Sequence, residues 1–222
     1  MHLAPRRTAL LHAFTLIELL VVIAIIAILM GLLLPVLAKV REQARNAQAK
    51  GDVTSIVAAV RQFHTDYGKY PQVSAALPSG DVLVGDAEAK ATIDNSALFD
   101  TLRAIDRGLN ERHALNPKRI VFFEGKTVSD PKEPRSGFAD RAETTKRGCF
   151  YDPWGRQYGI VIDADNDNQL ALTGQYSDFT GDNAPRVGVG AFSMGRDNQL
   201  GTKGDAQYRK GATTSDDVIS WQ

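Results

Sequence analysis

The chain has a single cysteine, Cys149, among its 222 residues, so it can form no intramolecular disulfide and offers a metal ion no cysteine pair. It also lacks an excess of either charge, because 26 lysine and arginine residues balance 26 aspartate and glutamate residues. This balance gives no indication of nucleic-acid binding, and we expect no nucleic-acid partner. The composition, 43% hydrophobic and 23% charged, is that of a folded globular protein.

The sequence also lacks the motifs of the common enzyme classes. His64 and His113 are isolated, neither an HExxH motif nor a P-loop is present, and residues 190–195 miss the spacing of a nucleophile elbow by one residue. We interpret Ser193 as structural, since nothing places a nucleophile beside a base. The prediction is a protein that is not an enzyme.

What is present is a long hydrophobic segment near the N-terminus. Residues 19–34 contain no charge, and the apolar run from 14 to 40 is interrupted only by one glutamate, one proline and one lysine. A membrane helix needs about 20 apolar residues, so the segment is long enough to span a bilayer. Because Arg6 and Arg7 precede it, the positive-inside rule predicts a cytoplasmic N-terminus and places everything after Val40 across the membrane.

Three interpretations of this segment are open. A secretory signal peptide would be cleaved after Ala38, although its apolar run exceeds the usual length of about 7–15 residues. An uncleaved anchor would simply hold the chain in the membrane. In the third interpretation the chain is cut between Ala13 and Phe14, and Glu18, which is costly in lipid, neutralises the new α-ammonium group of Phe14 in the same or a neighbouring chain. The third interpretation accounts for the glutamate.

The sequence Ala13-Phe-Thr-Leu-Ile-Glu18 resembles the prepilin processing motif of type IV pilins and type II secretion pseudopilins. The resemblance implies that residues 1–13 are a leader peptide, and that a dedicated prepilin peptidase cuts before Phe14 and methylates it. Ala13 stands where the family usually has glycine. Pro35, the twenty-second residue after the cut, matches a position where the family often has a proline that bends the helix.

The helix is predicted to continue beyond the membrane. Apolar residues recur every three or four positions from Val36 to Tyr67, with charged residues on the other side. We therefore assign residues 14–37 to a transmembrane and assembly helix and 38–67 to its amphipathic continuation. The glycine and proline that follow end the pattern, and Tyr70-Pro71 also resembles the pseudopilin pattern for the end of this helix.

Residues 68–222 are predicted to form a globular domain outside the cytoplasm. The fold class is α+β, with the long N-terminal helix packed on a small antiparallel sheet, which is a pilin-like fold. A short helix is expected around 98–105, capped by Asp94 or Asn95. The expected strands are residues 119–124, 158–162, 169–173, 189–193 and 218–221.

Two of these strands, 158–162 and 169–173, are expected to pair as a hairpin through an Asp- and Asn-rich turn, whereas residues 73–91 and 125–148 are expected to be loops. Before the hairpin, Asp152-Pro-Trp-Gly155 resembles an element of the major pseudopilins. We interpret it as a tight turn whose Trp154 fills the space between sheet and helix.

Two groups of aspartates are candidate calcium sites, because calcium takes six to eight oxygen ligands. Residues 192–198 and 216–221 resemble the C-terminal loop of the major pseudopilin, which closes around calcium, so the resemblance implies Asp197 and Asp217 as ligands, with Asp216 as a neighbour. The alternative, that these aspartates only cap turns, stays open.

The second group, Asp163, Asp165 and Asp167, matches the first half of an EF-hand loop. Its sixth position is Asn168 in place of glycine, and its twelfth is Gly174 in place of glutamate. We interpret this group as a solvated hairpin turn, with weak calcium binding as the alternative.

Together these resemblances imply a structural subunit of a type II secretion pseudopilus that assists protein export across the outer membrane. It would cross the inner membrane once, with its C-terminal domain in the periplasm, and polymerise through its N-terminal helix. The implied partners are other copies of the chain, the prepilin peptidase, other type II secretion pseudopilins and the inner-membrane platform. A type IV pilin subunit for adhesion, motility or DNA uptake and a monomeric membrane-anchored binding module are the alternatives.

Overall fold

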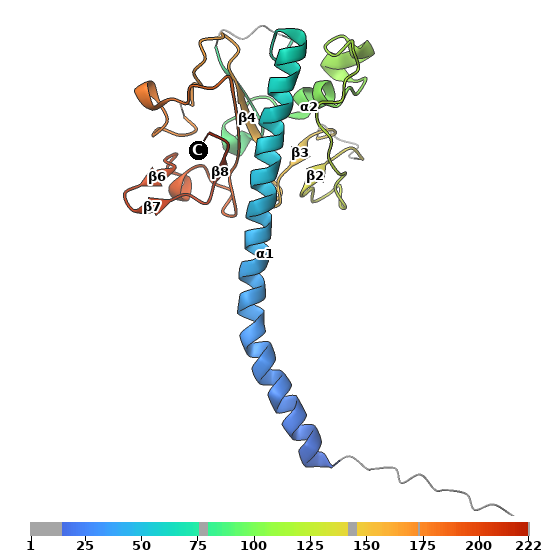
Figure 1. Cartoon of the computed structure of the whole chain (residues 1–222), viewed down its shortest axis with the longest axis vertical. Helices are drawn as coiled ribbons and strands as arrows, with labels where there is room; N and C mark the ends of the chain where they lie inside the picture. The colour runs from blue at the N-terminus through green and yellow to red at the C-terminus, as the bar shows by residue number, and fades with distance from the viewer. Residues whose placement is uncertain (1–14, 76–79, 142–145, 173, 222) are drawn as a thin grey trace, which may run out of the picture. The chain divides into compact units, whose positions relative to one another are not determined.

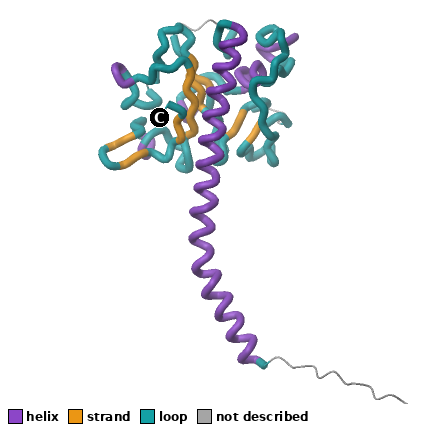
Figure 2. The backbone as a smooth tube through the Cα atoms, in the orientation of Figure 1, coloured by secondary structure: helices purple, strands orange, loops and turns teal. Residues whose placement is uncertain are grey.

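The computed structural model describes residues 15–75, 80–141, 146–172 and 174–221. The predicted processing site, Ala13 and Phe14, lies outside these residues. The chain divides into two compact units, residues 1–44 and 45–222, which are described separately. One long helix, α1 (Leu16–Tyr67), begins in the first unit and ends in the second (Figures 1 and 2).

The first unit contains the apolar part of α1. The helix continues without a break through Pro35, and its large hydrophobic side chains are exposed along its length, from Leu16 at 87% to Val40 at 52%. Over its most apolar window none of the helix is buried, and by length and composition α1 is able to cross a membrane. The predicted long helix is confirmed, including its end at Tyr67.

In the second unit α1 packs on a four-stranded antiparallel sheet with the order β1-β4-β5-β8. The strands are β1 (Val82–Val84), β4 (Gly159–Ile162), β5 (Val189–Ser193) and β8 (Val218–Ile219). The α+β fold with a long helix on an antiparallel sheet is thus present. Two further pairs of short strands, β2 (Gly137–Phe138) with β3 (Phe150–Tyr151) and β6 (Arg209–Lys210) with β7 (Thr213–Thr214), lie outside this sheet.

Side chains on the two faces of the sheet enter two different hydrophobic clusters, as the alternation of side chains along a strand requires. Ile160 and Ile162 of β4 pack with the buried face of α1, whereas Val161 packs on the opposite side with Phe192. The residues of α1 that are buried are Ala49, Val53, Ile56, Val57, Ala59, Val60 and Phe63. The part of α1 that enters the core of the domain therefore begins at Ala49, after the apolar segment has ended.

A glycine is required where β4 meets β5. Gly159 pairs with Phe192, and a Cβ atom at Gly159 would lie 2.3 Å from the Phe192 ring. The absence of a side chain at Gly159 therefore leaves room for the aromatic ring beside the neighbouring strand.

The predicted hairpin is wrong in its second strand. β4 is present, but residues 169–172 form no strand, and Thr173 lies outside the described residues. The reason is that both edges of β4 are already occupied, by β5 on one side and by β1 on the other. β1 and a 3-10 helix (Ala87–Ala89) lie within residues 73–91, which the sequence predicted to be a loop, and β2 lies within the predicted loop 125–148.

The predicted strand at residues 119–124 is also wrong. The segment instead follows the end of α2 (Ser96–Leu102), where the backbone N–H groups of Phe122 and Phe123 donate to the carbonyl of Leu102 at 2.8 and 3.3 Å. α2 confirms the predicted short helix, but it ends at Leu102, before Ile105. Asn95 is its N-cap residue without a side-chain cap bond, and Asp94 Oδ1 accepts from the N–H of Ser96 at 2.9 Å.

The remaining short elements are all 3-10 helices: Gly108–His113, Gly181–Asn183 and Thr202–Gly204.

Candidate functional site

The first turn of α1 holds the glutamate that the sequence singled out. Glu18 Oε2 accepts hydrogen bonds from the backbone N–H and the hydroxyl of Thr15 at 2.8 and 2.7 Å, and Glu18 N–H donates back to Thr15 Oγ1 at 3.3 Å. This reciprocal pattern is a capping box, in which two otherwise unpaired donors of the helix start are satisfied. The Thr-x-x-Glu spacing in the sequence was a signal for it that the sequence interpretation did not use.

Beyond this turn, the surface of α1 is an unpartnered apolar cylinder. Between Leu16 and Val40 the helix carries only Glu18 and Lys39 as charged residues. Val36, Val40, Ala44 and Ala47 belong to the amphipathic face predicted from the sequence, yet none of them is buried, whereas the same face is buried from Ala49 onward. Burial of this face therefore begins at Ala49.

The C-terminal loop brings together the three aspartates that the sequence placed there. Oxygens of Asp197, Asp216 and Asp217 lie within 4.8 Å of one another. Asp217 is 4% exposed; its Oδ2 accepts from the Tyr176 hydroxyl at 2.8 Å and from the N–H of Gly201 at 2.7 Å. Its Oδ1 is buried with no hydrogen-bond partner in the described part of the chain.

Burial and repulsion by Asp216 oppose the ionisation of Asp197 and Asp217 in this loop. Burial raises the pKa of Asp217 to about 6, against the lowering effect of its hydrogen bonds, and Asp216 adds to the rise. Burial, together with the charge of Asp216, also raises the pKa of Asp197. A hard cation among these oxygens would relieve both the repulsion and the unpaired buried oxygen, so the residues present fit calcium.

Gly195 allows the two halves of this loop to meet. It adopts a φ of +65°, and a Cβ atom there would lie 2.4 Å from the carbonyl oxygen of Asp216. Its N–H donates to Ser193 Oγ at 3.2 Å, and the Ser193 hydroxyl donates to Asp152 Oδ2 at 2.5 Å. Ser193 therefore has the structural role that the sequence predicted, since it connects β5 to the turn at Asp152.

Asp152 organises the Asp-Pro-Trp-Gly turn. It is fully buried, and its Oδ1 accepts from the N–H groups of Trp154, Gly155 and Arg156 at 2.9, 2.8 and 2.9 Å. Trp154 is 8% exposed and belongs to the main core cluster, which confirms the packing role predicted for it. The sequence interpretation missed the role of Asp152, although an aspartate before Pro-x-Gly is a signal for such a turn.

The second group of aspartates forms a hydrogen-bonded turn. Asp163 is 2% exposed, and its two carboxylate oxygens accept from the N–H groups of Asp167 at 3.2 Å and Asn168 at 2.8 Å. Asp167 Oδ1 accepts from the N–H of Gln169 at 2.8 Å. These bonds agree with the interpretation as a turn, and calcium binding here stays a prediction.

Asp81 joins this second group from the residue before β1. Oxygens of Asp81, Asp163 and Asp165 lie within 4.8 Å of one another, whereas Asp167 is not part of the group. Burial and the charges of the three other aspartates raise the pKa of Asp81 to about 6. Asp81 is about eighty positions away in the sequence, so only the β1–β4 pairing reveals this contact.

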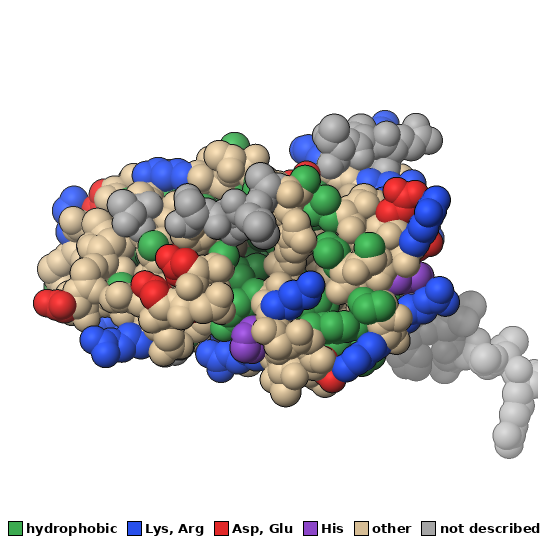
Figure 3. Space-filling view, turned by 90° about the horizontal axis from the view of Figure 1, so that it is seen from above, with side chains coloured by type: hydrophobic (Ala, Val, Ile, Leu, Met, Phe, Trp, Pro, Cys, Tyr) green, Lys and Arg blue, Asp and Glu red, His purple; other side chains and the backbone are tan. Residues whose placement is uncertain are grey.

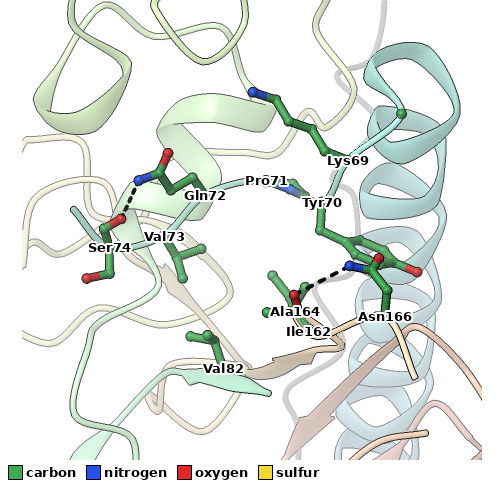
Figure 4. Close-up of a pocket in the computed structure, with 11 residues that line it drawn as sticks. Lys69, Tyr70, Pro71, Gln72, Val73, Ser74, Val82, Ile162, Ala164 and Asn166 are labelled. Carbon is green, nitrogen blue, oxygen red and sulfur yellow. Dashed lines mark hydrogen bonds between the residues drawn. The ribbon is translucent and has the colours of Figure 1, made fainter. Parts of the chain in front are cut away.

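A cavity lies beside the end of α1. It measures about 290 Å³ and is lined by the segment 68–74 together with Val82, Ile162, Ala164 and Asn166 (Figure 4). Among these described lining residues Lys69 is the only charged one. Seen from above, hydrophobic side chains are exposed among lysines and arginines at this end of the domain (Figure 3). The pocket holds no pair of groups suited to acid–base catalysis.

Comparison with known proteins gives two matches. Residues 12–34 match the prokaryotic N-terminal methylation motif. The chain is also 39% identical over 64 residues to the type II secretion system core protein G of Pseudomonas aeruginosa, an alignment that covers 29% of this chain and 45% of that protein. No solved structure matches. The chain therefore carries a prepilin-type N-terminus and is similar to type IV pilin-like proteins of the pseudopilin kind, which confirms the resemblance found in its sequence.

Proposed function

We propose that this chain is a structural subunit of a type II secretion pseudopilus that assists protein export across the outer membrane. The observation that carries the proposal is the exposed apolar cylinder of α1 behind a prepilin-type motif. Hydrophobic surface of this extent is stable only in lipid or against other helices. A helix that first lies in the inner membrane and then in the centre of a filament satisfies both conditions.

Processing is proposed to precede assembly. Prepilin peptidase would cut between Ala13 and Phe14 and leave a new cationic N-terminus four residues before Glu18. Within one chain Glu18 is held by Thr15. In the filament, the carboxylate of Glu18 would pair with the Phe14 ammonium group of an adjacent copy, since an ion pair in a low-dielectric environment is strong once both charges are desolvated together.

The periplasmic domain is proposed to bind calcium at the C-terminal loop. Asp197, Asp216 and Asp217 would supply carboxylate oxygens, and the unpartnered Oδ1 of the buried Asp217 is the observation that favours this loop. Bound calcium would hold together the two ends of the segment between Asp197 and Asp216. In the second group Asp81 Oδ1 is likewise buried without a hydrogen-bond partner among the described residues, but backbone N–H groups already occupy both oxygens of the buried Asp163.

The proposed role is assembly without catalysis, and the partners are those of a secretion filament: other copies of the chain, other pseudopilins and the inner-membrane platform. The alignment covers less than half of the core protein G. That protein therefore supports the proposal only through this partial likeness.

The deciding experiment is the intact mass and N-terminal sequence of the protein recovered from membranes of its host. A chain that starts at methylated Phe14 supports the proposal. A chain that starts at Lys39 would be an exported soluble domain, and one that starts at Met1 would be a simple anchor. Either of these two results contradicts the proposal.

Filament formation gives the second readout. Glu18→Ala is expected to abolish filaments, whereas Glu42→Ala, on the same helix beyond the apolar segment, serves as the matched control. Normal filaments from Glu18→Ala would contradict the pairing with Phe14.

A further inference from the structure

The domain carries opposite charge in two segments that lie on different sides of α1. Residues 103–147 contain eleven lysines and arginines against seven aspartates and glutamates. Residues 163–217 contain five lysines and arginines against nine aspartates. β2 of the basic segment lies on one side of α1, whereas β6 and β7 of the acidic segment lie on the other (Figure 1). The net charge of zero for the whole chain hides this separation.

Three of the eleven cations of this basic segment line one cleft beside the Asp-Pro-Trp-Gly turn. The cleft measures about 280 Å³, and its wall contains four cationic side chains against two carboxylates: Lys132, Arg135, Lys146 and Arg156 against Asp86 and Glu133. Trp154 and Gly155 of the turn also line the cleft.

The cations of the cleft are only partly neutralised within the chain. Arg156 pairs with Glu88 at 2.7 Å, and Arg135 approaches Glu133 at 3.7 Å, with both of these last two side chains more than half exposed. Lys132 and Lys146 are exposed and form no ion pair among the residues that the structure describes. The cleft therefore presents two exposed ammonium groups that form no ion pair within the described part of the chain, which suits a ligand with two adjacent carboxylates.

The chain itself carries such a ligand. The turn after β4 presents Asp165 and Asp167, both exposed, two positions apart and held by the hydrogen bonds of Asp163. No lysine or arginine lines the hollow that these two residues share with Asp81. The turn is thus a hydrogen-bonded group of carboxylates, two of them exposed, with excess negative charge.

We propose that the basic cleft docks the acidic turn of a second copy of this chain, with Lys132 and Lys146 facing Asp165 and Asp167. Because the two surfaces differ, the contact is heterologous, and a repeated heterologous contact that does not close into a ring builds a helical filament. This inference rests on the proposed function, since it supplies a lateral contact between the domains of a filament whose helices pack at its centre. The contact sets register between copies and is weakened by salt, as exposed ion pairs are.

The first test uses the unmodified full-length chain in membranes. Copies labelled with heavy nitrogen are mixed with unlabelled copies during assembly and treated with a carbodiimide, which joins a lysine amine to a carboxylate only where the two touch. Mass spectrometry of peptides is expected to find Lys132 or Lys146 joined to Asp165 or Asp167, with mixed isotopes that prove a contact between copies. Absence of these mixed pairs from chains that cross-link elsewhere overturns the inference.

The second test reverses charge. Lys132→Glu with Lys146→Glu, and Asp165→Lys with Asp167→Lys, are each expected to lower filament yield about tenfold or more, because like charges then face each other. The chain that carries all four changes restores complementarity and is expected to recover. The matched control is Arg112→Glu with Arg119→Glu, which reverses two exposed cations outside the cleft. Equal losses in the control, or no recovery in the fourfold variant, overturn the inference.

The two tests separate this contact from the proposed filament. Mixed cross-links without filaments support the docking contact and contradict the proposed function. Filaments without cross-links, and with normal yield after charge reversal, support the proposed function and overturn the docking contact.

Discussion

Asp152 shows how one buried carboxylate can fix a turn and a neighbouring loop at the same time. Its Oδ1 accepts three backbone N–H groups of the Trp154 turn, and its Oδ2 accepts the Ser193 hydroxyl, which in turn accepts from Gly195 in the candidate calcium loop. Burial raises the pKa of this carboxyl, and the four hydrogen bonds oppose the rise. The residue thus joins the turn to the C-terminal loop.

We predict that Asp152→Ala destabilises the domain by about 3 kcal/mol, because several buried donors lose their acceptor. The free energy of unfolding is measured by denaturant titration of the full chain in detergent, with tryptophan fluorescence as the signal. Asp182→Ala, an exposed aspartate of the 3-10 helix Gly181–Asn183, is the control and should change this energy by less than about 0.5 kcal/mol. Equal stability of both variants would contradict the role given to Asp152.

Asp217 gives the candidate calcium loop a defined dependence on pH. Its pKa is about 6 in the folded, calcium-free chain and ordinary, about 3.9, in the unfolded chain. As pH falls from 7 toward 4, the folded state therefore takes up a proton before the unfolded state does, so the free energy of unfolding rises, by at most about 3 kcal/mol. Above pH 6 the cost of the buried charge is fully present.

Calcium is expected to reverse this cost, because it binds the ionised carboxylates. We predict that added calcium raises the unfolding temperature above pH 6 and has little effect at pH 4.5, where protons compete for Asp217. Asp217→Asn should remove both the calcium effect and the pH dependence described above. The measurement is thermal unfolding with calcium or a chelator at several pH values, and an unchanged unfolding temperature at pH 7.5 would contradict the proposed site.

At the scale of elements, the segment between α2 and β2 is held by hydrogen bonds from a buried asparagine and forms no strand. Asn116 is fully buried: its Nδ2 donates to the carbonyls of Thr101 and Ile120, and its Oδ1 accepts from the Tyr67 hydroxyl and the N–H of Ile120. One side chain therefore connects the end of α1, the end of α2 and the segment that follows.

We predict that Asn116→Ala costs about 3 kcal/mol of unfolding free energy, because four buried hydrogen bonds lose one partner each. Loosening of the end of α1 should be visible as faster amide hydrogen exchange around Tyr67. Asn183→Ala, an exposed asparagine, serves as the comparison. Exchange that is unchanged near Tyr67 would show that this end of α1 is held by packing alone.

Asn116 also explains which elements could be predicted from the sequence. The long helix, α2, β4, β5 and β8 follow from periodicity and from β-branched runs, because each buries a regular face. Residues 119–124 have the same composition as a strand, but Asn116 and Leu102 already bind their backbone groups. Hydrogen bonds between residues that are distant in the sequence give no local sequence pattern. The same is true of the pairing of β1 with β4.

The candidate sites divide in the same way. Some site residues belong to motifs that can be recognised locally in the sequence: Thr15 and Glu18, the prepilin motif and the C-terminal aspartates. Asp197, Asp216 and Asp217 are brought together as expected. Asp81 and the Asp152–Ser193 bond depend on strands that meet from distant parts of the chain. Their roles required the sheet order before they could be seen.

At the scale of the whole molecule, one helix serves two different surroundings. Its later face, from Ala49 to Phe63, is buried by its own domain, so changes there act on folding. Its earlier face, which includes Val40 at 52% exposure, is exposed. If that face is an assembly surface, folding and assembly can be separated by the position of a substitution along a single helix.

We therefore predict opposite effects for one charge placed at two points of α1. Val40→Glu should change the unfolding free energy of the domain by less than about 0.5 kcal/mol, since the residue is exposed in the single chain, but should abolish filaments, because a glutamate would be desolvated between packed helices. Val60→Glu, at a fully buried position, should unfold the domain and prevent assembly only as a consequence. The two variants are compared by denaturant titration and by electron microscopy of membrane-derived filaments. Loss of domain stability in Val40→Glu would mean that the chain covers this face itself, and normal filaments would mean that the filament leaves it exposed to solvent.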